Sequence, residues 1–203
     1  AFAGGLGATF VMARLGTVQG VTGIATLLLA GVAVNALAGS LTGLLIFMAD
    51  DRQVRDITFW TLGSLAGSRW AQVPVVAVLA GIPTLLLCAL ARPLNALLLG
   101  EAEAFHLGIR VETVKRLALV LAAFAVAAGV AFTGLIGFVG LVVPHLIRLG
   151  FGADHRLVLP GAALLGGTLL VLADLLARSL AAPAELPVGV VTALLGAPFF
   201  LWL

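Results

Sequence analysis

The sequence predicts an all-α membrane protein, a polytopic bundle whose helices cross a bilayer several times. Apolar residues make up 62% of the 203 residues and charged residues only 10%, whereas a soluble domain carries about 25% charged residues. The 25 glycines are typical of membrane helices, where small residues let backbones approach closely. We therefore expect one transmembrane domain over residues 1–203, with lipid as its main surrounding.

Four apolar runs approach or exceed the roughly 20 residues that span a bilayer: residues 22–48, 71–91, 117–137 and 157–177. Residues 188–203 predict a further span and residues 1–13 the end of another, so we expect a fragment cut at both ends. Segment 138–150 is apolar but short, and Pro144 interrupts it. It is either a short crossing or a re-entrant piece, which is tolerated at membrane depth only when protein covers it.

The basic residues favour a crossing of segment 138–150. With a crossing, seven basic residues lie on one side and four on the other, and without it the split is six to five. The side with more basic residues is expected to be cytoplasmic. It then holds Arg14, Arg92, Arg110, Lys115, Arg116, Arg148 and Arg156. This places residues 92–116 and 150–156 inside and residues 49–70 and 178–187 outside.

Two polar segments predict short helices outside the bilayer core. In residues 49–70 mixed charges precede aromatic residues, which favours an external loop with an interfacial helix and with Trp60 and Trp70 at headgroup level. In residues 92–116 apolar and charged residues alternate, and Gly100 and Gly108 separate the pieces. That pattern favours amphipathic helices that lie on the membrane or dock a cytoplasmic partner.

The sequence lacks the motifs of an enzyme. It contains no G-x-x-x-x-G-K-[ST] nucleotide loop, no H-E-x-x-H and no cysteine–histidine cluster for a metal. The histidines at 106, 145 and 155 are far apart, and a structural or solvated role is the simpler interpretation of each. A net charge of +2 gives no support for nucleic-acid binding. We expect no catalytic site and no metal site in this chain.

Ionisable and polar residues in the spans deserve separate interpretation, because they are costly there. Asp174 and Arg178 are four residues apart, so they can form an ion pair within one helix. Alternatively, Arg178 is presented outward to an acidic partner. Asn35 lies within the first long run, where it either packs by hydrogen bonding across helices or lines a pathway.

Several motifs together resemble one protein family over nearly the whole chain. The longest is Thr133 to Arg148, TGLIGFVGLVVPHLIR, which is followed by GADHR at 152–156 and by motifs at 159–161, 173–178, 185–189 and 196–200. Residues 29–33 and 59–65 extend the match upstream. In this order they resemble the FecCD-type permeases, which import iron–siderophore, haem and vitamin B12 complexes through ABC transporters.

The resemblance implies a bundle of the type II ABC importer kind, with about ten helices per subunit, of which this chain supplies six or seven. It implies a homodimer with the pathway along the subunit interface, in the bacterial cytoplasmic (inner) membrane. Two cytoplasmic ATPase subunits would carry the ATP and magnesium, and an external, periplasmic binding protein would deliver the substrate. The chain itself would then bind no cofactor.

The resemblance also assigns residues. The segment from Gly100 to Gly108 matches the family's cytoplasmic coupling loop, and Arg178 matches an outward-facing arginine that contacts the binding protein. Residues 50–60 match a short helix over the external mouth, and residues 22–26 match the start of a gate-forming helix, where Ile24 and Ala25 replace small hydroxyl residues of the vitamin B12 permease. The coupling residues implied by the resemblance are Gly100, Glu101, Glu103, Ala104, His106, Leu107 and Gly108. The candidate gate or pathway residues are Thr22, Ile24, Ala25, Thr26 and Asn35.

Segments 101–108 and 152–156 look most like haem permeases, which favours haem or another iron chelate as the substrate over a vitamin B12 complex. Two other functions stay open. An ATP-independent channel or secondary transporter would need ionisable residues in its spans, and the four long runs hold none apart from Asp174 near one end. A truncated permease without activity is the third alternative.

Overall fold

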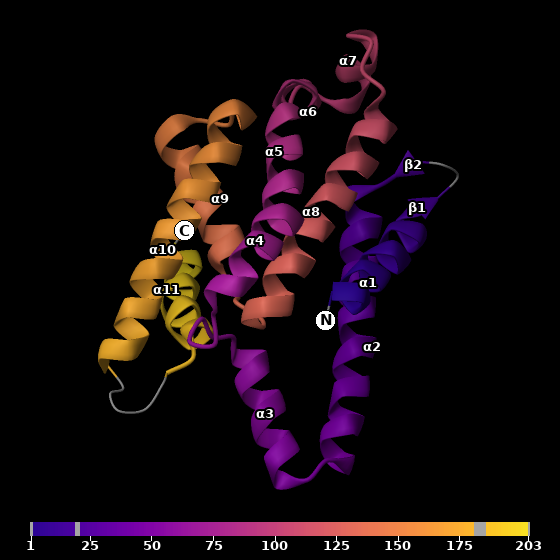
Figure 1. Cartoon of the computed structure of the whole chain (residues 1–203). Helices are drawn as coiled ribbons and strands as arrows, with labels where there is room; N and C mark the ends of the chain where they lie inside the picture. The colour runs from indigo at the N-terminus through magenta and orange to yellow at the C-terminus, as the bar shows by residue number, and fades with distance from the viewer. Residues whose placement is uncertain (1, 19–20, 181–185, 203) are drawn as a thin grey trace.

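The computed structural model describes residues 2–18, 21–180 and 186–202. In these residues the predicted all-α bundle is confirmed, with one small exception near the start of the chain (Figure 1). There two short antiparallel strands, which the sequence did not predict, pair between the first two helices. The order is α1 (Phe2–Leu15), β1 (Thr17–Val18), β2 (Val21–Thr22), α2 (Ile24–Met48), α3 (Asp51–Leu62), α4 (Val73–Val76), α5 (Ile82–Ala89), α6 (Ala91–Leu97), α7 (Glu101–His106), α8 (Val111–Thr133), α9 (Val139–Phe151), α10 (His155–Leu180) and α11 (Val188–Trp202).

Among the described residues, four helical segments are long and apolar enough to cross a membrane: Ala25–Met48, Trp70–Ala89, Val111–Thr133 and His155–Leu180. They correspond to the four predicted runs. Shorter apolar helices cover Phe2–Leu15, Val139–Phe151 and Val188–Leu201. Ala1 and Leu203, at the ends of the two predicted terminal segments, lie outside the described residues.

Helix α3 occupies the segment where a short outer helix was predicted. Asp50 caps it in a capping box, since its Oδ1 accepts from the Gln53 N–H at 2.8 Å and its own N–H donates to Gln53 Oε1 at 3.3 Å. Such a cap satisfies backbone donors that the first helical turn leaves free. Trp60 and Trp70 are exposed, at 45% and 90%. Their exposure permits the predicted contact with lipid headgroups.

The second long span is an irregular helix. A 3₁₀ turn (Trp70–Gln72) leads into α4, and a π-helical turn (Ala77–Gly81) joins α4 to α5. Pro83, in the first turn of α5, has no N–H to donate to the carbonyl of Leu79 four residues earlier. Because a wider π turn often accompanies such a break, the proline explains why this span is not one regular helix.

Helix α8 differs from the predicted span 117–137. It begins at Val111 and ends at Thr133, so the predicted boundaries were wrong by several residues at both ends. At its start Glu112 and Arg116 form an ion pair within the helix, at 3.6 Å, so the charged residues continue the helix as its first turns. At its end Gly134 has φ of 70°, a conformation that breaks a right-handed helix and favours glycine.

Helix α9 runs antiparallel to α8 and α10, back toward the end of the bundle where α10 begins (Figure 1). Phe138 precedes it with φ of 65°, and Pro144 lies inside it. This direction is the one expected if segment 138–150 crosses the membrane. The bundle therefore has two ends. One carries α7 and the α9–α10 turn, and the other carries the α2–α3 turn and the end of α10 (Figure 1).

Burial within the chain is sparse. A small core joins α10 to α11 through Ala173, Ala177, Val188 and Val191. In the most apolar stretch of α2 only 6% of the residues are buried within the chain, compared with 22% in that of α8. Leu28, Leu29, Val32 and Leu37 on α2 are each about two-thirds exposed, between 67% and 71%. An apolar surface of this extent is covered by lipid or by further protein in a stable molecule.

Candidate functional site

The predicted coupling loop forms an arm of two short helices, α6 and α7. Gly100 and Gly108 bracket α7 with φ of 118° and 81°, values that L-residues with side chains rarely adopt. At residue 100 a Cβ would also lie 2.4 Å from Glu103 Oε2. These two glycines give the sharp turns that lift α7 beyond the end of the bundle (Figure 1).

One face of α7 is fixed to the chain and the other is free. Ala104 is fully buried at 0% exposure, and Glu101 forms an ion pair with Lys115 of α8, whose side chain is only 14% exposed. On the free face Phe105 and Leu107 are 70% and 64% exposed, next to exposed Glu103 and His106. An exposed mixture of apolar, acidic and imidazole side chains on a fixed helix is suited to docking against another protein.

A polar junction, not predicted from the sequence, connects α6 to the turn between α9 and α10. The Asn95 amide Nδ2 donates to Asp154 Oδ1, and Asn95 Oδ1 accepts from the backbone N–H of His155 at 2.8 Å. His155 Nδ1 also lies 2.8 Å from Asn95 Oδ1. Since an amide oxygen can only accept, that contact requires the proton on Nδ1. The partners are 59 and 60 residues apart in sequence, so no local pattern could reveal them.

Asp154 also caps α10. Its Oδ1 accepts from the Arg156 N–H at 2.9 Å, and its carbonyl accepts from the N–H groups of Leu157 and Val158. The hydrogen bonds from Arg156 and from Asn95 favour the charged carboxylate and lower the pKa of Asp154 below 3.8. The junction therefore contains an ionised carboxylate at neutral pH.

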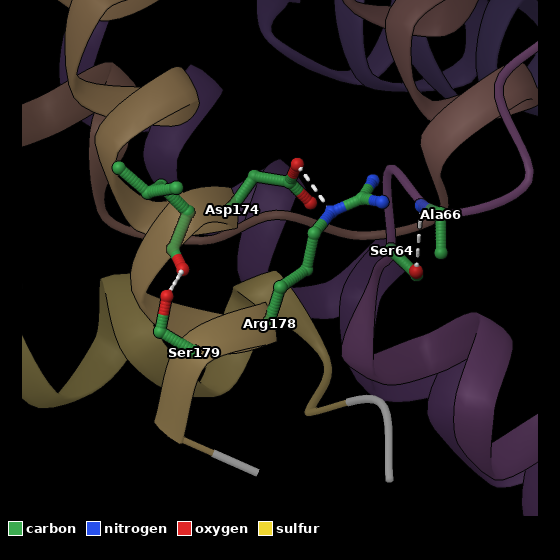
Figure 2. A network of polar contacts seen from close by, with 6 residues as sticks. Ser64, Ala66, Asp174, Arg178 and Ser179 are labelled. Atoms are coloured by element: carbon green, nitrogen blue, oxygen red, sulfur yellow. Dashed lines mark hydrogen bonds and ion pairs between the residues drawn. The ribbon is translucent and has the colours of Figure 1, made fainter. Parts of the chain in front are cut away.

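The second predicted site lies at the opposite end of the bundle, on α10. Arg178 Nε donates to Asp174 Oδ2 at 2.8 Å, while the Arg178 side chain stays 54% exposed. Figure 2 shows its guanidinium between the Asp174 carboxylate and the turn with Ser64 and Ala66. The ion pair within one helix is thus present, and the arginine is the more exposed of its two members. Residues 181–185 of the predicted outer loop lie outside the described residues.

Close to Arg178, backbones meet at a glycine junction that joins α3, α8 and α11. The Ser64 N–H donates to the Thr133 carbonyl at 2.8 Å, and the Leu135 N–H donates to the Trp60 carbonyl at 3.3 Å. A Cβ on Gly134 would lie 2.2 Å from the Trp60 oxygen, and one on Gly189 would lie 2.0 Å from the Leu62 oxygen. Only glycine permits this approach, so α3 packs with direct backbone contact against the ends of α8 and α11.

A cavity of about 680 Å³ opens beside this junction along α11. Thr61 supplies its one hydroxyl, which already donates to the Ile57 carbonyl at 2.8 Å. The wall therefore offers an apolar surface without a free side-chain donor. It is lined by Thr61, Leu62, Leu135, Gly137, Phe138, Gly189, Val190, Ala193, Leu194, Ala197, Pro198 and Leu201.

Four of the five predicted gate or pathway residues lie together where β2 leads into α2, and Asn35 lies apart from them. Thr22 ends β2 and Ile24 begins α2, Ala25 is exposed and Thr26 is half-buried. Asn35 is exposed on α2, about 16 Å further along the helix axis. Its amide has no hydrogen-bonding partner recorded among the described residues, so a packing role within this chain is not supported. In those residues no three His, Cys, Asp or Glu side chains come together to hold a metal.

Comparison with known proteins gives one consistent family. The model of the FecCD transport family matches residues 1–203. The hemin transport system permease HmuU of Yersinia pestis is 53% identical over 181 residues, covering 89% of this chain and 54% of that protein. The cobalamin import permease BtuC of Halobacterium salinarum is 48% identical over 203 residues, covering 100% and 54%. The chain thus spans about half the length of these curated relatives.

A solved structure shares the fold. It is described as an inward-facing conformation of a candidate metal-chelate type ABC transporter. The TM-score is 0.86 at 36% identity, and the match covers 98% of this chain and 62% of the other. The arrangement of helices in this chain is therefore closely similar to that of the solved transporter chain.

Proposed function

The chain belongs to the FecCD transport family, and we propose that it serves in a membrane permease that imports haem or another iron chelate, driven by ATP hydrolysed on separate subunits. The observation that carries the proposal is the free face of α7. Glu103, Phe105, His106 and Leu107 project from a helix that Ala104 and the Glu101–Lys115 pair hold in place. Such a fixed, exposed helix can receive force from a docked ATPase.

The substrate proposal is supported by kinship. HmuU, the relative at 53% identity, is named for hemin, whereas relatives at 48% and 40% identity are named for cobalamin or vitamin B12. The higher identity favours haem, and a siderophore or vitamin B12 is the alternative substrate. A wall without free side-chain donors, as in the cavity along α11, suits transit, because a substrate must leave a pathway as readily as it enters.

The remaining partners follow from the same proposal. A second permease copy would cover exposed apolar helices such as α2, and lipid would cover the rest. An external binding protein would dock beside α3, where the Arg178 side chain is 54% exposed. The assembly would sit in the bacterial cytoplasmic membrane, with the α7 end inside.

The test of the docking role is Glu103→Arg in the permease that carries this chain, produced together with its ATPase. We expect the charge reversal to reduce ATPase co-purification and chelate uptake about tenfold, which corresponds to about 1.4 kcal/mol of binding free energy. The matched control is Asp56→Arg on exposed α3, at the other end of the bundle, which should leave ATPase co-purification unchanged. Normal assembly and uptake with Glu103→Arg would contradict the docking role.

A further inference from the structure

Asn95 is placed between two parts of the chain that must move together if α7 receives force. It lies on α6, three residues before the loop 98–100 that leads into α7. Its side chain reaches across to the residue that caps α10 and to the first residue of α10. The contact therefore joins the docking arm to a long membrane helix rather than closing a local turn.

The orientation of the Asn95 amide is determined by its partners. Asp154 offers a carboxylate, which only accepts, and the His155 backbone N–H only donates. Rotating the amide by half a turn would place its oxygen against the carboxylate and its NH₂ against the N–H, so both contacts would become repulsive. An asparagine thus fits this position through both of its polar atoms, which a packing residue would not require.

The junction reaches more than one membrane helix. Gly152, with φ of 85°, donates to the Arg148 carbonyl at 3.0 Å and ends α9, so the α9–α10 turn is tight. Helix α9 packs along α10. A displacement of Asp154 and His155 would therefore carry both helices. On its other side the arm is fastened to α8 through the Glu101–Lys115 ion pair.

We propose that Asn95 is a positioning residue, which ties the α6–α7 arm to the α9–α10 turn so that displacement of α7 by the ATPase moves α9 and α10. The proposal rests on the proposed function, since it needs an ATPase on α7. It assigns coupling, and not docking, to Asn95. If the contact is lost, the ATPase still binds α7, but the displacement of α7 during ATP hydrolysis no longer moves α9 and α10 fully.

The experiment uses the assembled transporter, reconstituted with its ATPase and binding protein, and measures ATP hydrolysed per haem imported. With Asn95→Ala and with Asp154→Ala we expect this ratio to rise about fivefold or more, the smallest change typical of a lost coupling between sites, with ATPase co-purification unchanged. The effect of the double variant should be smaller than the sum of the two single effects, because both substitutions remove the hydrogen bond between Asn95 and Asp154. Asp154→Asn keeps an acceptor oxygen for Asn95 and should stay near the wild-type ratio.

Arg156→Ala is the matched control, because its backbone N–H, which donates to Asp154, survives the change. It should keep the wild-type ratio. An unchanged ratio in Asn95→Ala would overturn the proposal, even if thermal stability falls, since that result indicates a purely structural contact. Additive effects of the two alanine variants would also overturn it. Failure of the proposed function would appear differently, as a wild-type protein that binds no ATPase or imports without ATP.

Discussion

Asp174 and Arg178 lie one turn apart on α10, and their 2.8 Å hydrogen bond holds the arginine beside the turn of Ser64 and Ala66 (Figure 2). The carboxylate is the less exposed partner, at 23% against 54%. The pair thus aims a cation at the region where α3 is fastened to α8 and α11. The sequence left two alternatives for Arg178, an ion pair within the helix or presentation to an acidic partner. The two are compatible, because the ion pair orients the side chain that a partner would contact.

Arg178→Glu should weaken binding-protein docking. The change places two carboxylates one turn apart and reverses the charge at residue 178. We therefore expect the affinity for the external binding protein, measured by pull-down, to fall about tenfold or more. Arg178→Ala should lose less. Stability should change by less than about 0.5 kcal/mol, since exposed pairs within a helix contribute little. Equal affinity in all three proteins would remove Arg178 from the docking face.

Gly134→Ala and Gly189→Ala should each destabilise the protein by about 2 kcal/mol or more, because each methyl group would overlap a carbonyl oxygen of the α3 end. Thermal unfolding in detergent measures the effect. Gly167→Ala on α10 is the control, with nothing within 4 Å of the added Cβ. Similar melting temperatures for all three variants would show that the close contacts of Gly134 and Gly189 do not hold α3 in place.

Protonation of Asp154 should weaken the Asn95 junction. Hydrogen bonds lower the pKa of Asp154 below 3.8, so its stabilising contribution is complete at neutral pH and is lost as pH falls through the folded-state pKa. We expect the wild-type protein to be more stable than Asp154→Asn at neutral pH, and this difference to disappear at a pH low enough to protonate Asp154. A difference that shrinks near neutral pH would contradict the assignment.

His145→Phe distinguishes an ATP-driven importer from an ion-coupled transporter. His145 lies in α9 with a buried Nε2 that has no partner among the described residues, and its ring meets Phe199 edge-on at 6.0 Å. Removing an unsatisfied buried nitrogen should leave stability equal or raise it by about 1 kcal/mol. ATP-driven uptake should persist. Uptake abolished in a normally folded variant would favour proton coupling through His145.

The sequence predicted those features that depend on local composition. Apolar length indicated the four long helices, and the mixed charges after Ala49 indicated α3, whose cap from Asp50 to Gln53 is local. The boundaries of α8 were missed because a charged first turn looks like a loop when its ion pairs are unknown. The pairing of Thr17–Val18 with Val21–Thr22 was missed because strands of two residues carry no periodic signal.

Some residues of the candidate sites could likewise be named from the sequence, and others could be recognised only in the folded chain. Glu103 and Arg178 were named from the sequence through the family resemblance; the structure shows that both side chains are exposed, and their roles stay predictions. Asn95 was not found, since its role exists only once Asp154 and His155 have folded against it. Gly134 and Gly189 were counted among many glycines, and only the nearby carbonyls of Trp60 and Leu62 show why these two are required.

The central claim is best tested by haem uptake into proteoliposomes that contain the permease carrying this chain, its ATPase and its binding protein. We predict uptake that requires ATP and the binding protein, and that falls about tenfold with Glu103→Arg, equivalent to about 1.4 kcal/mol. Uptake of a siderophore or vitamin B12 but not haem would change the substrate and keep the mechanism. Uptake that proceeds equally without ATP would contradict the account.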